Sequence, residues 1–316
     1  MIWIEKYRPT EFDEIVGQDK NIKMIERMME GGSLPHLLLH GKSGVGKTST
    51  IMSIANKLYG KNRPFMMIRL DASDDRGINT VREEIKGFAE KMTPFNRGIK
   101  LIILDEADSM TFDAQFALRR IIEKYSDDTR FCIICNYMNK IIAPIKARCI
   151  NIKFNLIENN VIVDRLKYIC SNEKLKYEKN SLESIATISN GDLRKAINIL
   201  QSLSMMGKKI DIESCYNSAG IPSPELINNF YEKLLDKKCN FLETKEYADK
   251  YIISECYTLS FIIQEINKKI IDNIKDNTDE KHIIKYIEEL SELEYNISQS
   301  IFTDMYIIGL IAIFKK

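Results

Sequence analysis

The sequence feature that most constrains the fold is the stretch GKSGVGKT, which follows the apolar run LLLH directly. It fits GxxxxGK[ST] at every fixed position, and an apolar helix-like segment follows it. In such a loop, glycines let backbone N–H groups surround phosphates at the positive end of a helix. A Gly-rich turn of another α/β enzyme is the plainer alternative. The residues expected to hold ATP phosphates are Gly41, Lys42, Ser43, Gly44, Val45, Gly46, Lys47, Thr48 and Ser49.

The motif LIILDEAD supplies the second half of this expected site. A Mg²⁺ ion bound with ATP needs a second ligand at the carboxyl end of a central strand, which assigns Asp105 to the metal beside the hydroxyl of Thr48. Glu106 stands one residue further and is placed to polarise an attacking water, so the chain is expected to hydrolyse ATP. A cluster of helix-capping carboxylates is the alternative, and the order of the two motifs argues against it.

Up to about residue 155, short β-rich apolar runs alternate with stretches of helix length. The runs are LPHLLLHG, MMIRLDAS, IKLIILDEAD, RFCIICNY and CINIKFN. This alternation is typical of a parallel sheet with crossover helices. Residues 1–155 are therefore expected to form an α/β domain.

From about residue 156 the strand signal stops. The segments VIVDRLKYIC, SLESIATIS and DLRKAINILQSL carry apolar residues at the three- and four-residue spacing of amphipathic helices. The segment AGIPSP then holds the last two prolines of the chain, and only one glycine follows it. Residues 156–220 are expected to form a small helical domain, and residues 221–316 a second one behind a linker.

Composition limits the partners of the chain. Lys plus Arg number 46 and Asp plus Glu 45, so the net charge is +1 and any contact with nucleic acid must come from local clusters. The longest apolar stretches, such as YIIGLIAIF, are far shorter than the roughly 20 residues that span a bilayer. No membrane contact is expected.

The seven cysteines are scattered, which argues against a disulfide framework and for a reducing, intracellular compartment. The N-terminus MIWIEKYRP has neither the apolar region of a signal peptide nor the look of a transit peptide. Cys132 and Cys135 have CxxC spacing, but they lie inside the apolar run FCIIC. Buried strand cysteines are expected there, with a metal or redox site as the alternative.

Several sequence blocks resemble one family, the small subunits of replication factor C, the AAA+ clamp loader of eukaryotes, archaea and some large DNA viruses. The blocks are WIEKYRP, VGQ, GKSGVGKTS, LDASDDRGI, LDEAD, AQFALRR, TRFCIICNY, ARC and GDLRKAIN, between residue 3 and about residue 206. The resemblance implies a RecA-like AAA+ domain, a helical lid and a helical oligomerisation collar. It also implies an active site completed by a neighbouring subunit in a five-membered ring.

The resemblance assigns further residues to the ATP site. It implies that Asn136 is the sensor that holds the attacking water or the γ-phosphate, that Arg194 is the sensor on the helical lid, and that Arg148 is an arginine finger acting on ATP of the adjacent subunit. The segment from Ile4 to Arg8, with Val16, resembles the part of the family that folds over adenine. Two positions depart from the family pattern, because Ala147 replaces a serine before the finger and Asp71 replaces an asparagine.

The expected contacts with primer-template DNA lie at two helix starts, whose N–H groups bind phosphates without reading sequence. The residues concerned are Arg76, Gly77, Arg82, Thr111 and Arg119. Solvated helix faces with charge pairs are the alternative for the arginines. Ile85 and Phe88 form an apolar ridge that resembles the family's contact with the sliding clamp. Burial in the domain's own core is the alternative for this ridge.

The sequence thus predicts an ATPase subunit that couples ATP and Mg²⁺ to opening a sliding clamp and loading it on primer-template DNA. Its expected partners are the other loader subunits, the clamp and DNA. Its expected location is the nucleus of a eukaryote, a viral replication site or an archaeal cytoplasm. Two rival functions are another AAA+ DNA-remodelling motor and a scaffold subunit that binds ATP without hydrolysing it.

Overall fold

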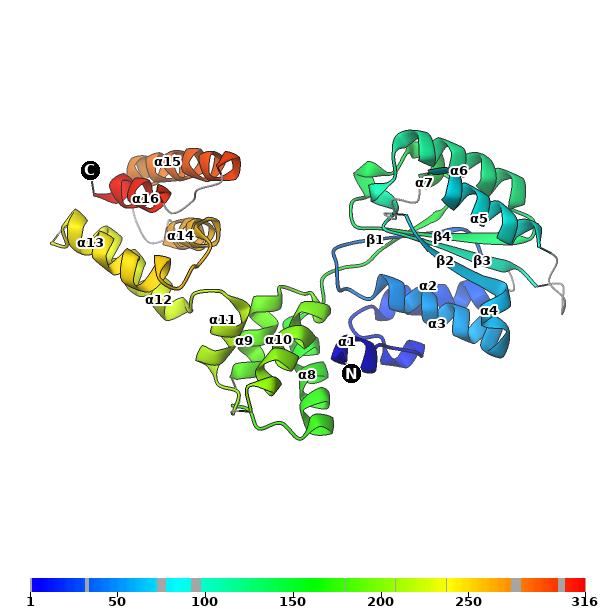
Figure 1. Ribbon diagram of the computed structural model, residues 1–316, viewed down its shortest axis with the longest axis horizontal. Coiled ribbons are helices and arrows are strands. Elements are labelled where there is room, and N and C mark those ends of the chain that lie inside the picture. The colour runs from blue at the N-terminus through cyan, green and yellow to red at the C-terminus, as the bar shows by residue number, and fades with distance from the viewer. Residues whose placement is uncertain are drawn as a thin grey trace. The chain divides into compact units, whose positions relative to one another are not determined.

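The computed structural model describes residues 2–31, 34–72, 78–91, 98–178, 180–207, 209–236, 238–273, 280–300 and 305–315, with backbone only at 78–82, 273 and 280–282. The chain divides into two compact units, Met1–Lys209 and Ile210–Lys316. The first contains the sheet and the second is helical (Figure 1). The three-part division at residues 155 and 220 stays a prediction.

The first unit is built on a five-stranded sheet whose paired strands are all parallel. The strands are β1 (Leu37–His40), β2 (Met67–Asp71), β3 (Lys100–Asp105), β4 (Thr129–Cys135) and β5 (Ile150–Lys153). Their order is β2-β3-β4-β1-β5. Each strand coincides with one of the apolar runs named above, β4 beginning one residue before its run, so the predicted α/β fold is confirmed.

Successive side chains along the strands point to opposite faces of the sheet, and this alternation divides the core of the first unit in two. Leu37 and Leu39 of β1 enter one core, whereas Leu38 enters the other. Successive side chains of a strand point to opposite faces, so a fully buried sheet needs apolar residues at every position. The six residues of β3 are accordingly all buried.

Helices cover both faces of the sheet (Figure 1). One face carries α2 (Asp19–Glu30), α3 (Lys47–Tyr59) and α4 (Arg63–Met66), and the other carries α5 (Ile78–Glu90), α6 (Phe112–Tyr125) and α7 (Ala143–Lys146). Short helical turns are α1 (Trp3–Lys6), η1 (Phe12–Glu14), η2 (Gly60–Asn62), η3 (Ala107–Ser109) and η4 (Met138–Lys140). In α3, Ile51 and Ile54 are fully buried at the three-residue spacing of an amphipathic helix.

The same alternation determines which polar residues face α3 at the carboxyl ends of the strands. Ile103 of β3 and Ile134 of β4 belong to the core on the α3 side. Asp105 and Asn136 each follow one of these residues by two positions, so strand geometry sends them to the same side. The fold therefore brings an acid and an amide to the start of α3.

The lid of the first unit consists of α8 (Asn159–Glu173), α9 (Ser181–Ser189) and α10 (Leu193–Met205). The three helices agree with the segments predicted from apolar spacing. The chain turns between α9 and α10 at Gly191, where φ is +81° and a Cβ atom would lie 2.7 Å from the Cβ of Leu156. Only glycine fits this close crossing without rearrangement.

The second unit begins with α11 (Ile212–Ala219), and the helices after it pack around one core. They are α12 (Pro224–Leu235), α13 (Phe241–Ala248), the π-helix η5 (Asp249–Ile253), α14 (Leu259–Asn273), α15 (Glu280–Gln299) and α16 (Tyr306–Phe314). Phe230, Ile263, Leu290 and Leu310 are fully buried and come from four of these helices. The apolar positions thus form one contiguous core.

A lysine near the chain end caps α12. The ammonium of Lys315 donates hydrogen bonds to the carbonyls of Lys233, Asp236 and Cys239 at 2.7, 2.6 and 2.9 Å. The last carbonyls of a helix have no partner within the helix and favour positive charge. Lys315 therefore joins the end of α16 to the end of α12.

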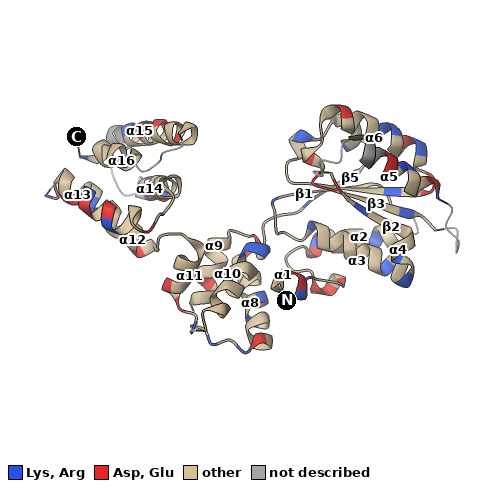
Figure 2. Ribbon diagram, in the orientation of Figure 1, with Lys and Arg blue, Asp and Glu red and all other residues tan. Residues whose placement is uncertain are grey.

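The burial of Cys132 and Cys135 and the distribution of charged residues agree with what the sequence predicts. Cys132 and Cys135 are buried in β4, and burial raises the pKa of the Cys135 thiol to about 11. Figure 2 shows positive and negative residues interspersed along the helices of both units, in line with the net charge of +1. Among the described residues, no helix is both long and apolar enough to cross a bilayer.

We expect Lys315→Met to destabilise the second unit by about 2 kcal/mol, because it removes hydrogen bonds from a charged donor. Urea unfolding of the full chain measures the loss. Lys285→Met is the matched control, since Lys285 is exposed and lies 3.9 Å from Glu289. Equal stability of the two variants would contradict the capping role.

Candidate active site

The loop between β1 and α3 adopts a backbone that only glycines allow easily. Gly44 and Gly46 have φ values of +68° and +99°, and α3 begins directly afterwards at Lys47. At Gly41, a Cβ atom would lie 2.4 Å from the carbonyl oxygen of Phe154. These glycines leave the start of α3 open to a phosphate chain, because side chains would fill or distort the loop.

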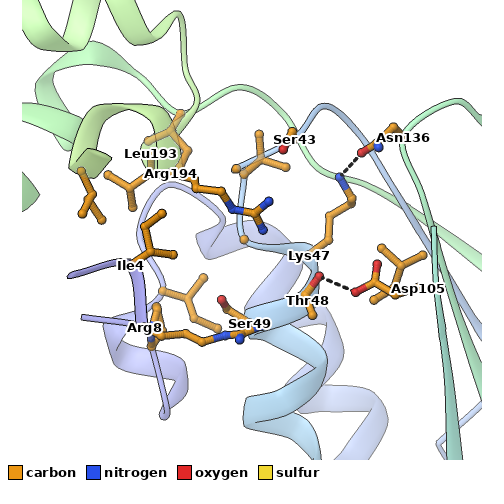
Figure 3. A pocket seen from close by; sticks show the side chains of 18 of the residues that line it. Ile4, Arg8, Ser43, Lys47, Thr48, Ser49, Asp105, Asn136, Leu193 and Arg194 are labelled. Atoms are coloured by element: carbon orange, nitrogen blue, oxygen red, sulfur yellow. Dashed lines mark hydrogen bonds between the residues drawn. The ribbon is translucent and has the colours of Figure 1, made fainter. Parts of the chain in front are cut away.

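Lys47 is a buried cation, with 7% of its surface exposed. Its ammonium donates hydrogen bonds to the carbonyls of Gly41 at 2.6 Å and Lys42 at 2.7 Å, and to the side-chain oxygen of Asn136 at 2.9 Å (Figure 3). Burial lowers the pKa of Lys47, and the charge of Asp105 opposes that effect. A buried ammonium held by neutral acceptors is a strong attractor for phosphate oxygens.

Thr48 and Asp105, the expected Mg²⁺ ligands, lie next to each other. The Thr48 hydroxyl donates to Asp105 Oδ2 at 3.1 Å (Figure 3), and the Glu106 N–H donates to Asp105 Oδ1 at 3.1 Å. One hydroxyl and one carboxylate beside a phosphate loop are the donor set that Mg²⁺ takes when it binds with a nucleotide. These residues therefore fit the metal that the sequence predicts.

Glu106 has a left-handed backbone, with φ at +53°. This conformation is uncommon for residues other than glycine and is maintained only where the surroundings enforce it. Here it directs the chain from β3 into η3 while Glu106 lines the cleft. The turn therefore keeps Glu106 in the cleft wall, one residue after Asp105.

A cleft of about 340 Å³ opens over the loop. Its polar wall contains Lys47, Thr48, Asp105 and Asn136 (Figure 3). Its apolar lining includes Ile4, Pro9, Ile15, Val16, Ile157, Leu193 and Ile197. A cleft with one cationic polar end and one apolar end suits a ligand that joins a polyanion to a flat base.

The lid contacts the phosphate loop directly. The N–H of Leu193 donates to the carbonyl of Gly44 at 3.3 Å. A Cβ atom on Gly44 would lie 1.7 Å from a carboxylate oxygen of Asp192, the residue that caps α10. Arg194 follows in the first turn and lines the cleft (Figure 3). The start of α10 thus lies against the loop at Gly44.

The N-terminal segment is bound to the lid by contacts that the sequence analysis did not find. The Trp3 N–H donates to Gln201 Oε1 at 2.9 Å, and the Tyr7 hydroxyl donates to Glu173 Oε1 at 2.5 Å. Lys6 lies 2.6 Å from the same oxygen. Ile4 and Arg8, on the same segment, line the cleft. No local motif predicts that Glu173 contacts the N-terminal segment, because its partners lie far away in the chain.

Asp108 is a second residue that the sequence analysis missed. Its Oδ2 accepts hydrogen bonds from the backbone N–H groups of Asn136 at 3.2 Å and Tyr137 at 3.1 Å. It therefore fixes the turn after β4 that presents Asn136 to Lys47. The signal was present as the last residue of LDEAD, but its partner lies beyond the next strand.

Other predicted site residues lie away from the cleft. Gly41 and Lys42 shape the loop through their backbone and are not part of the cleft wall. Arg148 is one-third exposed, donates to the carbonyl of Pro144 at 2.9 Å and pairs with Glu123. It does not line the cleft of its own chain.

The predicted DNA contacts are described only in part. Thr111 caps α6 and accepts a hydrogen bond from the Ala114 N–H at 3.3 Å, and Arg119 on that helix lies 3.0 Å from Glu123. The described residues do not include Arg76 and Gly77. Arg82 lies in α5, and its side chain is outside the described part.

Ile85 requires a correction. It was expected to contact the sliding clamp, but it is 1% exposed and belongs to the core between α5 and the sheet. A side chain with so little accessible surface offers a partner almost nothing to contact. Phe88 is partly buried against the same core, with the Lys100 ammonium 5.6 Å from its ring centre.

The fold and site define a P-loop ATPase of the AAA class. Residues 37–156 match the ATPase family associated with various cellular activities (AAA). Residues 164–205 match the RCF1/5-like AAA+ ATPase lid domain, and residues 222–312 match the replication factor C C-terminal domain. The chain belongs to the replication factor C small-subunit family.

Relatives resemble the chain over nearly its whole length. Probable replication factor C subunit 5 of Dictyostelium discoideum is 41% identical, covering 94% of this chain and 85% of its own. The replication factor C small subunit of Sulfurisphaera tokodaii is 36% identical over 99% of this chain and 94% of its own. The solved Holliday junction branch migration motor RuvB of Thermotoga maritima has a TM-score of 0.54 and 18% identity, covering 83% and 91%. That likeness concerns the fold alone.

We expect Asp108→Ala to lower ATP turnover about ten- to hundredfold while nucleotide affinity changes little, because Asn136 loses its alignment. Turnover of the assembled complex and nucleotide binding to the chain measure the two effects. Asp108→Asn keeps one oxygen acceptor and should lose less. Asp113→Ala, an exposed change in the first turn of α6, is the control. A parallel loss of affinity and turnover would refute the positioning role.

Proposed function

We propose that this chain is an ATPase subunit of a clamp loader, which uses ATP binding and hydrolysis to open a sliding clamp and load it on primer-template DNA. One observation carries the proposal: Lys47, Thr48, Asp105, Glu106 and Asn136 converge on one cleft of the first unit. The family of the chain, whose relatives carry the name replication factor C, supports the choice of clamp loading.

Each residue of the cleft has a distinct task in hydrolysis. The buried ammonium of Lys47 binds terminal phosphate oxygens, and Asn136 beside it orients the attacking water or the γ-phosphate. The Glu106 carboxylate accepts a hydrogen bond from the attacking water and makes its oxygen a better nucleophile. Mg²⁺, held by Thr48 and Asp105 when ATP is bound, supplies positive charge against the triphosphate. The products are ADP and phosphate.

The active site is shared between neighbouring subunits. Arg148 does not line its own cleft, and its guanidinium lies at the surface, where a neighbour's γ-phosphate can approach. Arg194 from the lid acts on ATP bound by the same chain. Five such subunits arranged in a ring would let each finger act on the next site. Ala147 directly precedes Arg148, Asp71 lines the cleft at the end of β2, and neither departure removes one of the arginines.

Coupling to DNA and clamp completes the cycle. The start of α6 at Thr111, with Arg119, is proposed to follow the template backbone together with Arg76, Gly77 and Arg82. Phe88 remains the proposed clamp contact on α5. ATP favours the ring state that holds an open clamp and DNA, and hydrolysis favours release. The chain would act wherever its source replicates DNA, in a nucleus, a viral replication site or an archaeal cytoplasm.

Clamp loading by the complex that co-purifies with this chain tests the function. With ATP, Mg²⁺ and primed circular DNA, the wild-type complex should leave closed clamps on the circles. Glu106→Gln should still bind ATP, clamp and DNA, but turnover at its site should fall at least about a hundredfold because the general base is lost. Circles that stay free of clamp with the wild-type complex would refute clamp loading. Full turnover by Glu106→Gln would favour the scaffold alternative.

Arg148→Ala tests the shared site. We expect unchanged nucleotide affinity of the variant chain and a loss of up to about 10³-fold in hydrolysis at the neighbouring site, since the arginine stabilises transition-state charge. Single-turnover hydrolysis in complexes with one variant subunit measures this. Lys167→Ala, which removes an exposed cation from α8, is the control. Weaker nucleotide binding by the Arg148→Ala chain itself would place the arginine in its own site.

A further inference from the structure

A second cation, in addition to Lys47, lines the cleft beside the expected Mg²⁺ ligands. Arg69, at the centre of β2, lines the cleft, and its Nη2 lies 2.9 Å from Asp105 Oδ2. The hydroxyl of Thr48 donates to that same oxygen at 3.1 Å. No role in the hydrolysis described above uses Arg69.

Strand register explains why Arg69 reaches this oxygen. Arg69 pairs with Ile103 on β3, so Asp105 is its diagonal neighbour two residues along. Residues paired in register share a face of the sheet, and Ile103 faces α3, where Thr48 lies. A diagonal neighbour is too distant for short side chains and within reach of an arginine. The contact therefore follows from the backbone.

The two oxygens of Asp105 have different surroundings. Oδ1 accepts the N–H of Glu106 at 3.1 Å, which holds it on the side of the following turn. Oδ2 accepts a hydrogen bond from the Thr48 hydroxyl and pairs with the Arg69 guanidinium. It therefore lies on the side of Thr48, the other expected metal ligand. A guanidinium and Mg²⁺ both seek this oxygen, and their positive charges repel each other at short distance.

We propose that Arg69 is a positioning residue that holds Asp105 through Oδ2 and competes with Mg²⁺ for that oxygen. This inference rests on the proposed Mg²⁺–ATP site and deepens it. Binding of the metal must break the Arg69–Asp105 pair, so Arg69 raises the Mg²⁺ concentration at which nucleotide binding is half-complete. The Arg69 side chain is 39% exposed, so the released guanidinium moves into water at modest cost.

Titration of Mg²⁺ in the presence of a fluorescent, non-hydrolysable ATP analogue tests the proposal on the full chain. Arg69→Gln should lower the half-saturating Mg²⁺ concentration about two- to tenfold, the range expected for a partly exposed pair relieved of repulsion. Analogue affinity in EDTA should stay the same, because the competition needs the metal. Arg69→Lys keeps the positive charge and should remain within about twofold of the wild type.

Arg63→Gln is the matched control, since Arg63 hydrogen-bonds Asn56 at 2.7 Å and lies outside the cleft wall. An unchanged Mg²⁺ midpoint in Arg69→Gln would overturn the competition. Equal weakening with and without Mg²⁺ would overturn it as well and make Arg69 a phosphate ligand. Should Arg69→Gln fail to fold, Arg69→Met removes the same charge and keeps most of the aliphatic stem; a lower midpoint than in the wild type supports the competition, and an equal one opposes it. Absence of Mg²⁺-dependent binding in the wild type would instead refute the ATP site itself.

Discussion

The buried ammonium of Lys47 is the interaction on which the rest of the site depends. It joins the loop after β1, through the carbonyls of Gly41 and Lys42, to the turn after β4, through Asn136. A cation in this position is tolerated because neutral oxygens surround it, and it is useful because none of these three acceptors cancels its charge. A triphosphate would meet an unneutralised positive group in a place where water screens little.

Local patterns made the fold and half of the site predictable. The strands could be predicted because a sheet covered on both faces needs continuous apolar runs, and Lys47, Thr48 and Asp105 could be predicted because their roles require fixed neighbours in sequence. Asp108, Glu173 and Arg69 could not be found in this way. Each acts on a residue from another element, so its task depends on strand register or lid packing. Ile85 shows the converse error, since an apolar helix face looks the same whether it meets a core or a partner.

The cleft combines three parts of the first unit whose responses to a ligand differ. The loop and strand ends belong to a fully packed sheet and have little freedom. The N-terminal segment and the lid have only a few polar contacts with each other, among them those of Trp3 and Tyr7. A nucleotide that touches all three would gain most of its specificity from the rigid part. Its effect on conformation would come through the other two.

The attachments of the lid also differ in their electrostatic character. At Gly44 the lid is held by a backbone hydrogen bond and by the steric fit of Asp192 over a missing side chain, and neither depends on ionic strength. At Glu173 an exposed ammonium supplies part of the contact, and dissolved ions screen such pairs. Raising the salt concentration would therefore weaken the contribution of Lys6, while the hydrogen bonds of Trp3 and Tyr7 still join the N-terminal segment to the lid. The cover over the apolar part of the cleft would respond to ionic strength, and the contact at the phosphate loop would not.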